Sequence, residues 1–152
     1  MAYAGEFKDF NGNPASVDDY LSKDKWTVVM FWASDCHICN EEIAQYVNFS
    51  REHSDKDARV LGISLDGDAK LADAREFVKR HKVDFPNLIG EAEDVASFYM
   101  SSSQQAFAGT PSFFIYSPAG ELRIAQVGAV PAELIAKFIE EQTAKPQDKN
   151  TP

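Results

Sequence analysis

Residues 32–39, which read WASDCHIC, decide the fold, because they join an apolar run to a segment with the periodicity of a helix. They also contain the only two cysteines of the chain, Cys36 and Cys39. Two thiols at this spacing can close into a small disulfide and open again. A helix that begins beneath Cys36 favours the thiolate, which is the form that attacks a disulfide. The sequence therefore predicts a redox site where a strand gives way to a helix.

The size and charge of the chain limit its class. A chain of 152 residues, 44% of them hydrophobic, is long enough for one buried core and short for two. We expect one domain over residues 1–142 and a polar, disordered tail over residues 143–152. A net charge of −9, with no Lys/Arg cluster in the sequence, argues against a nucleic acid or an anionic membrane as partner.

The cellular compartment is not determined by composition. The longest apolar run, residues 27–33, is far shorter than the roughly 20 residues that span a bilayer, so we expect no membrane crossing. Residues 1–5 lack the basic start and apolar stretch of a signal peptide, although an exported protein expressed without its leader would look the same. A catalytic cysteine pair can operate in reducing cytosol or in an oxidising periplasm.

Alternating apolar and periodic segments predict an α/β fold with a central mixed sheet and helices on both faces. The continuous apolar run at 26–32 is typical of a strand covered on both faces. Asp35 is the expected N-cap of a helix over 36–53. Other expected strands cover 59–65, 112–116 and 122–127, and other expected helices cover 69–81, 94–100 and 131–142. Residues 11–14 are expected to form a turn, and residues 15–21 a short helical or turn segment.

Residues 31–39, together with the segment GTPSFFI at 109–115, resemble the thioredoxin superfamily over roughly residues 5–142. The extra strand and helix between residues 60 and 98, and the opening segment 11–21, resemble the TlpA/ResA branch of thiol:disulfide oxidoreductases. That branch overlaps the peroxiredoxin-like group in architecture. The resemblance implies a thioredoxin-like fold with an inserted strand and helix after the helix that carries the cysteines.

The resemblance also implies roles for individual residues. Cys36 would be the exposed nucleophile, Cys39 the buried resolving thiol, and Pro111 a cis-proline whose loop faces the disulfide. Glu42 falls where the ResA-like branch has an acidic residue near the active site. The family usually has Trp before the first cysteine, where this chain has Asp35, and ordinary thioredoxins have a buried Asp where this chain has Met30. The second departure shifts any acid/base role toward Glu42.

Two side chains beside Cys36 are candidates for tuning its reactivity. A protonated His37 would stabilise the thiolate, whereas the carboxylate of Asp35 would oppose it. The alternative for His37 is an exposed spacer without a catalytic part. The alternative for Glu42 is an ordinary acidic residue in the first turns of a helix, where the helix dipole favours it.

Thr110, Pro111 and Trp32 are candidates for substrate binding. A proline at this place must begin the following strand or occupy a special turn. A cis bond would leave the Thr110 backbone free to pair with an extended substrate segment, and the alternative is a trans proline that starts the strand. Trp32 is either a core aromatic or a substrate contact.

No metal or cofactor is expected. A zinc site needs two further ligands, and His37, His53 and His81 do not have the spacing of a zinc finger. Haem attachment needs a histidine after the second cysteine, where this chain has Asn40. The acidic residues at 66 and 68 are expected to form a plain turn.

The leading hypothesis is thiol–disulfide exchange between the Cys36/Cys39 pair and cysteines of a protein substrate. The resemblance implies a periplasmic or otherwise exported reductase, in cytochrome c maturation or at copper-site cysteines, with a membrane thiol relay as electron donor. A cytoplasmic location is the alternative. A monomer is the default expectation.

Three other activities stay open. One is a disulfide oxidase of the same chemistry. Another is a peroxiredoxin-like peroxidase, although such enzymes want Thr or Ser three residues before the reactive cysteine and Pro further upstream, where this chain has Ala33 and Val29. The third is a Cu(I)-binding module that uses Cys36, Cys39 and His37, because thiolates select Cu(I).

Overall fold

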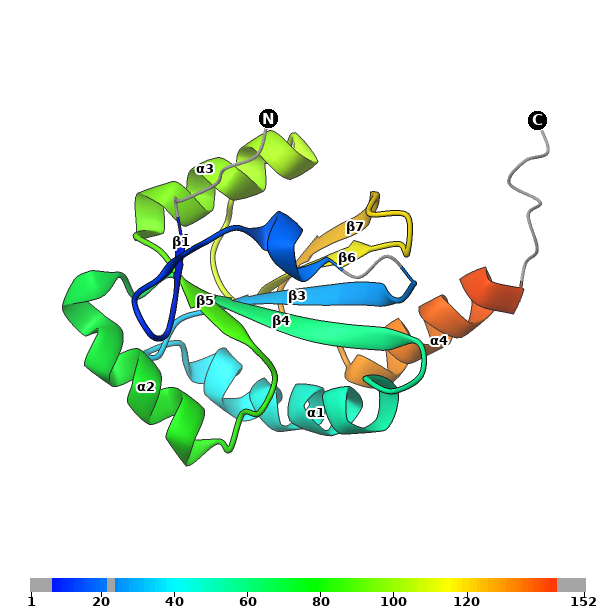
Figure 1. Ribbon diagram of the computed structural model, residues 1–152, viewed down its shortest axis with the longest axis horizontal. Helices are drawn as coiled ribbons and strands as arrows, with labels where there is room; N and C mark the ends of the chain where they lie inside the picture. Colours follow the sequence, from blue (N-terminus) through cyan, green and yellow to red (C-terminus); the bar gives the residue numbers. More distant parts are fainter. Residues whose placement is uncertain (1–6, 22–23, 145–152) are drawn as a thin grey trace.

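A seven-stranded mixed sheet forms the centre of the molecule, with strand order β2-β1-β5-β4-β3-β6-β7. The computed structural model describes residues 7–21 and 24–144 (Figure 1). The strands are β1 (Phe7–Asp9), β2 (Pro14–Ala15), β3 (Trp26–Trp32), β4 (Ala58–Ser64), β5 (Asn87–Ile89), β6 (Ser112–Tyr116) and β7 (Leu122–Val127). The α-helices are α1 (His37–His53), α2 (Leu71–Arg80), α3 (Ala92–Ser103) and α4 (Ala132–Ala144), and the 3-10 helices are η1 (Val17–Tyr20) and η2 (Asp68–Lys70).

Strand β3 lies inside the sheet, between β4 and β6, and all seven of its residues are buried. It pairs in parallel with β4, from Trp26 opposite Ala58 to Trp32 opposite Ser64. On its other side it pairs antiparallel with β6. This confirms the prediction of a strand covered on both faces, and it explains why the residues of β3 are apolar almost without interruption.

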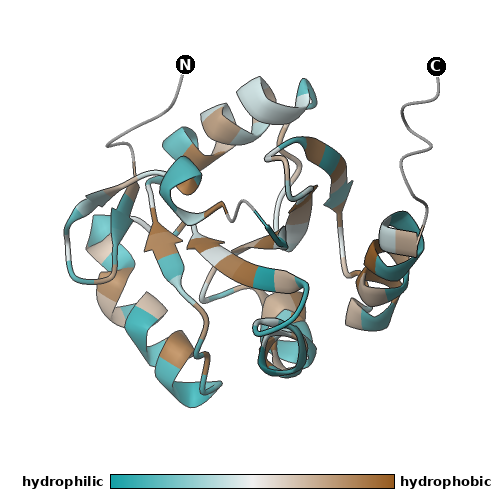
Figure 2. Cartoon of the chain, turned by 45° about the vertical axis from the view of Figure 1, so that its right-hand side comes forward, coloured by the Kyte–Doolittle hydropathy of each residue, from teal (hydrophilic) through white to brown (hydrophobic). Residues whose placement is uncertain are grey.

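Helices cover both faces of the sheet, as predicted. Successive side chains of a strand point to opposite faces, so β3 divides between two cores. Val28 and Met30 pack in the core that includes α1, α2 and α4, whereas Val29 and Phe31 pack in the core that includes α3 and η1. Figure 1 shows α3 on one side of the sheet and α1 and α2 on the other. In Figure 2, apolar residues are concentrated in the strands that these helices cover.

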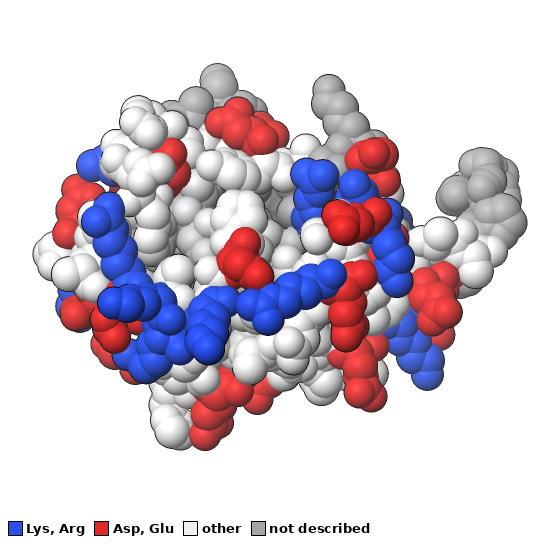
Figure 3. Space-filling model, turned by 60° about the horizontal axis from the view of Figure 1, so that its bottom comes forward, with Lys and Arg blue, Asp and Glu red and all other residues white. Residues whose placement is uncertain are grey.

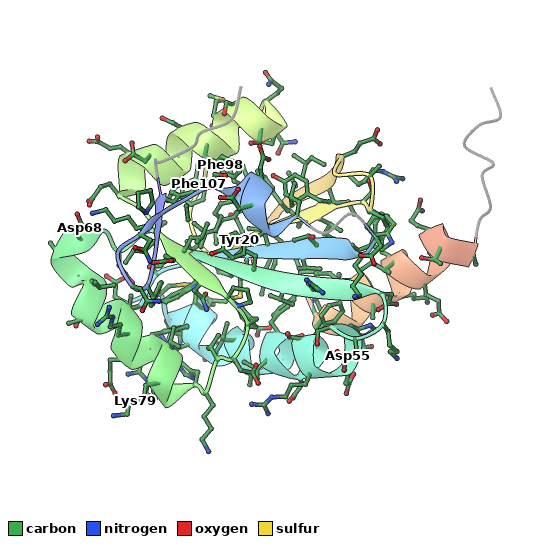
Figure 4. The ribbon with its side chains drawn as sticks, in the orientation of Figure 1. Tyr20, Asp55, Asp68, Lys79, Phe98 and Phe107 are labelled. Atoms are coloured by element: carbon green, nitrogen blue, oxygen red, sulfur yellow. A yellow bond between two sulfur atoms is a disulfide. The ribbon has the colours of Figure 1, made fainter. Side chains whose placement is uncertain are left out.

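Aromatic rings fill the core beneath α3. Phe98 from α3 and Phe107 from the loop after it both contact Phe31, with ring centroids 6.3 Å and 6.1 Å away. Figure 4 shows both side chains between α3 and the sheet. Helix α3 therefore packs directly against the strand that leads to the cysteines.

Several elements differ from their predicted form. Residues 7–15 form a hairpin whose first strand pairs antiparallel with β5, with Lys8 opposite Ile89. Helix α3 is longer than the predicted 94–100, and α4 continues through residue 144, so the first two residues of the predicted tail are helical. The remainder of that tail, residues 145–152, lies outside the described residues. Within the described part of the chain, no helix is both long enough and apolar enough to cross a bilayer.

Candidate active site

Cys36 and Cys39 form a disulfide at the start of α1, with their Cα atoms 5.2 Å apart. The two residues differ in exposure, since Cys36 is partly exposed and Cys39 is fully buried. Strand β3 ends at Trp32, and residues 33–36 connect it to the helix. Cys36 is therefore the more accessible residue of the pair.

Cys36, and not Asp35, is the N-cap of α1. Its backbone is extended (φ −84°, ψ 113°), and its Sγ accepts a hydrogen bond of 3.1 Å from the backbone N–H of Cys39. The predicted N-cap at Asp35 is wrong because the helix begins one residue later, which leaves Asp35 exposed before it. In the reduced protein, an N–H donor and a helix N-terminus at this sulfur would stabilise a thiolate.

Asp66 ties the loop before Cys36 to the end of β4. Its carboxylate accepts hydrogen bonds from the backbone N–H of Ser34 at 3.1 Å and from the Ser34 hydroxyl at 3.1 Å. The hydroxyl of Ser64 donates to the same carboxylate at 2.9 Å. Sequence reasoning missed this contact, although parallel pairing of β3 with β4 brings the residues that follow the two strands together. The acidic turn is thus an anchor for the cysteine loop.

Asn40 connects the same loop to the C-terminal end of α2. Its Nδ2 donates to the carbonyl oxygens of Ser34 and Cys36, at 3.2 Å and 2.9 Å. Its Oδ1 accepts from Nη2 of Arg80 at 3.0 Å and from Nε2 of His81 at 2.7 Å. The sequence contained no local signal for this network, because Arg80 and His81 lie about forty residues further along the chain.

His37 lies on the surface beside the disulfide. Its side chain is 83% exposed, and its Nε2 is 3.0 Å from the carboxylate of Glu41, one helical turn away. An exposed pair of this kind contributes little to stability. The contact turns the ring toward the next turn of α1.

Glu42 lies three residues after Cys39, on the same side of α1. Its carboxylate accepts a hydrogen bond from the side chain of Gln45, whose own carbonyl oxygen accepts the backbone N–H of Ala132. Tyr46 donates to the backbone carbonyl of Val130. Burial raises the pKa of Tyr46 well above its ordinary value, and the charge of Glu42 adds to the increase. Glu42 therefore belongs to a network that joins α1 to the start of α4.

The loop before β6 lies beside the cysteine loop. Phe31 pairs with Ser112, so by the same antiparallel register Pro111 and Thr110 face the end of β3 and the residue after it. The peptide bond between Thr110 and Pro111 is cis. The hydroxyl of Ser112 donates to the carbonyl of Gly109 at 2.6 Å. Sequence segments that lie far apart thus meet at one end of the sheet.

Trp32 is a core residue. Its side chain is fully buried, its ring stacks on Phe77 with centroids 4.1 Å apart, and its Nε1 donates to Oδ1 of Asn87 at 3.0 Å. The structure therefore does not offer this side chain to a substrate. Exposed apolar side chains near the site are Ile38, between the cysteines and 41% exposed, and Val127, opposite Ser112 and 47% exposed. Sequence reasoning missed both, because exposure depends on the packed structure.

Exposed basic side chains gather on the face formed by α1 and α2. Figure 3 shows Lys and Arg in a band across this face, with acidic side chains around it. Exposed basic residues on α1, on α2 and in the turn after α2 include Arg51, Arg75, Lys79, Arg80 and Lys82. Lys79 extends away from the end of α2 in Figure 4. This grouping was not expected from a chain with a net charge of −9 and no Lys/Arg cluster in its sequence.

Among residues 7–21 and 24–144, no group of three or more His, Cys, Asp and Glu side chains is arranged to hold a metal ion. The Cu(I) site considered from the sequence would require Cys36, Cys39 and His37 to act together. In the structure the two sulfurs are bonded to each other and His37 contacts Glu41.

A buried and an accessible cysteine, joined at the first turn of a helix on this sheet, define a thiol:disulfide oxidoreductase with a thioredoxin-like fold. More particularly, the chain belongs to the AhpC/TSA family, whose model matches residues 2–125.

Individual relatives agree with this class. The chain is 22% identical over 135 residues to sporulation thiol-disulfide oxidoreductase A of Bacillus subtilis, covering 88% of this chain and 76% of the relative. A shorter match is 39% identical over 59 residues to alkyl hydroperoxide reductase C of Mycolicibacterium smegmatis, covering 34% of this chain and 30% of the relative. Among solved structures, a thiol:disulfide interchange protein from Chlorobium tepidum superposes with a TM-score of 0.73 at 19% identity, covering 92% of each chain. StoA from Bacillus subtilis superposes with a TM-score of 0.64 at 20% identity, covering 91% of this chain and 96% of StoA. The superpositions confirm the predicted thioredoxin-like fold.

Proposed function

We propose that this protein reduces disulfide bonds in exported proteins, with the Cys36/Cys39 dithiol as the electron source. The observation that carries the proposal is the unequal burial of the pair, which leaves Cys36 accessible and encloses Cys39. A nucleophile must reach the substrate, whereas a resolving thiol needs to reach only the nucleophile. The hydrogen bond from the Cys39 N–H to the Cys36 sulfur supports a thiolate at the accessible position.

The reaction proceeds in two exchanges. The Cys36 thiolate attacks one sulfur of a substrate disulfide, the sulfur–sulfur bond of the substrate breaks, and one substrate thiolate leaves. Cys39 then loses its proton and attacks the Cys36 sulfur, which releases the second substrate thiolate and forms the Cys36–Cys39 disulfide. Two electrons pass from the enzyme to the substrate. Glu42 or water accepts the proton of Cys39; the position of Glu42 one turn after Cys39 supports the first choice.

The loop at Thr110 and Pro111 is the proposed contact for the substrate backbone, because the register of β6 brings it to the cysteine end of β3. An extended substrate segment there would add main-chain hydrogen bonds. The exposed side chains of Ile38 and Val127 would cover apolar groups of the same segment. We propose an exported location and a membrane dithiol protein as electron donor, in line with the resemblance to the TlpA/ResA branch.

Insulin reduction in the presence of a dithiol donor tests the activity. The wild type should accelerate precipitation of the insulin B chain, and Cys36→Ser should not. Equal rates for the two proteins would overturn the proposal. The direction of the reaction is tested by equilibrating the pair with glutathione or dithiothreitol buffers. A reduction potential near that of thioredoxin, about −270 mV, supports a reductase, whereas one near that of DsbA, about −120 mV, indicates an oxidase.

A peroxidase is the second candidate, favoured by the local match to alkyl hydroperoxide reductase C. The position three residues before Cys36 carries Ala33, which is buried and has no hydroxyl group to bind a peroxide. Consumption of hydrogen peroxide at a rate far above that of free cysteine would favour this candidate over protein disulfide reduction.

A further inference from the structure

The side chain of Asn40 makes four hydrogen bonds at the cysteine loop, and the exchange reaction described above uses none of them. Asn40 follows Cys39 directly. Its amide lies between the carbonyls of Ser34 and Cys36 on one side and the side chains of Arg80 and His81 on the other.

The hydrogen-bond donors and acceptors among these four partners match those of an asparagine side chain. The two backbone carbonyls can only accept hydrogen bonds, and they face the NH₂ group of Asn40. The guanidinium of Arg80 can only donate, and it faces the amide oxygen. An aspartate at this position would direct a second oxygen at the two carbonyls. The site therefore requires a side chain with a donor on one side and an acceptor on the other.

His81 completes the acceptor side. Burial lowers the pKa of His81, and the nearby charge of Arg80 lowers it further, so the neutral ring is favoured near pH 7. Because the oxygen of Asn40 only accepts, the hydrogen of the neutral ring belongs on Nε2, 2.7 Å away. The same ring packs against Phe77, with centroids 4.6 Å apart, and Phe77 stacks on Trp32 at the end of β3. The end of α2 thus contacts both sides of the strand-to-helix junction.

We propose that Asn40 is a positioning residue for thiol exchange. It holds the carbonyl oxygen of Ser34 on the α2 side of the loop, so that this oxygen does not turn toward the sulfur of Cys36. A carbonyl dipole directed at that sulfur would oppose its negative charge and raise its pKa. The carbonyl of Cys36 also accepts the backbone N–H of Asn40 at 3.1 Å, so the Asn40 side chain adds to a hydrogen bond of the helix there. Arg80 and His81 keep the amide in the required orientation. This inference deepens the proposed function and rests on Cys36 acting as the attacking thiolate.

The test is the pH dependence of Cys36 alkylation by iodoacetamide in the reduced protein, measured for Asn40→Asp and Asn40→Ala. Both variants should show a raised pKa of the Cys36 thiol. Since a net hydrogen bond corresponds to about 0.5–1.5 kcal/mol, the alkylation rate at pH 6 should fall roughly twofold to tenfold. The matched control is Asn48→Asp, which makes the same change at an exposed position two turns further along α1 and should titrate like the wild type.

A second pair of variants separates positioning from folding. His81→Gln keeps an N–H donor for the Asn40 oxygen and should stay close to the wild type, whereas His81→Leu removes that donor and should shift the Cys36 titration in the same direction as Asn40→Ala. Thermal unfolding of every variant is measured alongside. Wild-type titration in Asn40→Ala and His81→Leu, with only their melting temperatures lowered, would mean a purely structural role and overturn the inference.

The alkylation experiment does not depend on the substrate or on the direction of exchange. If the wild type fails to reduce insulin but the Asn40 variants still shift the Cys36 titration, the proposed function fails and the positioning role stands. If insulin is reduced but the Cys36 titration of the Asn40 variants does not change, the proposed function stands and the positioning role of Asn40 fails.

Discussion

Trp32 and Asn87 are joined by a hydrogen bond of 3.0 Å from Nε1 to Oδ1, and Gly62 of β4 lies against this bond. A Cβ atom at residue 62 would overlap Oδ1 of Asn87 and lie 2.8 Å from Nε1 of Trp32. The side chain of Asn87 is itself held, because its Nδ2 donates to the carbonyl of Phe85 at 2.9 Å. Glycine at residue 62 is thus required by a side-chain contact and not by a turn.

Gly62→Ala should therefore lower the free energy of unfolding by about 1–3 kcal/mol, the usual cost of overpacking a filled core. Asn87→Ala should cost about 1–3 kcal/mol, because it leaves the buried Nε1 of Trp32 without an acceptor. Urea unfolding of both single variants and of the double variant measures how far the effects at Gly62 and Asn87 on the free energy of unfolding depend on each other. The double variant should cost less than the sum of the two, since alanine at residue 87 removes the overlap. Strict additivity would contradict this account of Gly62.

Asp66→Ala should destabilise the cysteine loop, because three hydrogen bonds from Ser34 and Ser64 lose their acceptor. We expect the free energy of unfolding to fall by about 1–3 kcal/mol. Asp68→Ala is the matched control two residues away. Its carboxylate is 67% exposed and pairs with Lys8 at 3.3 Å, so its loss should change stability by no more than about 0.5 kcal/mol. Equal losses for the two variants, measured by urea unfolding, would show that Asp66 is not a special anchor.

The lowered pKa of His81 predicts a pH dependence of stability. Burial is the main cause, and Arg80 adds to it. The unfolded chain, with an ordinary histidine pKa of about 6.5, binds this proton more readily than the folded protein does. Stability should therefore fall as the pH drops below about 6.5, and this contribution should level off below the folded pKa. Urea midpoints at pH 7.5 and 5.5 should differ less in His81→Gln than in the wild type. An identical difference in both would exclude His81 as the source.

Cys39→Ser should accumulate mixed disulfides with protein substrates, because the buried thiol that resolves them is missing. Cys36→Ser should accumulate none, since the remaining sulfur is fully buried. Non-reducing gels of each variant, incubated with an oxidised protein substrate, make the comparison. Adducts formed equally by both variants would contradict the assignment of Cys36 as nucleophile and Cys39 as resolving thiol.

The strands and helices around the cysteines were predictable because their signals are local. The apolar run of β3 and the periodicity of α1 each lie within one continuous segment, and the structure has both close to the expected bounds. The N-cap was misplaced by one residue, because the sulfur of Cys36 takes the acceptor role that a side-chain oxygen of Ser, Thr, Asp or Asn usually has. The pairing of β1 with β5 was not predictable, since its two strands are about eighty residues apart and each has only three residues.

The sequence by itself determined the class of the protein, because CxxC spacing, a preceding apolar strand and a following helix are properties of adjacent residues. Only the tertiary structure decided which side chains support that site. Asp66, Arg80 and His81 reach the cysteine loop from segments 32 to 41 residues away from their partners. The structure also shows that Cys39 is buried whereas Cys36 is partly exposed. It places Trp32, a candidate substrate contact, in the core. Such contacts depend on how strands pair and helices pack. A hydrogen bond between residues that are distant in the chain produces no periodic pattern in the sequence, so it cannot be predicted from one.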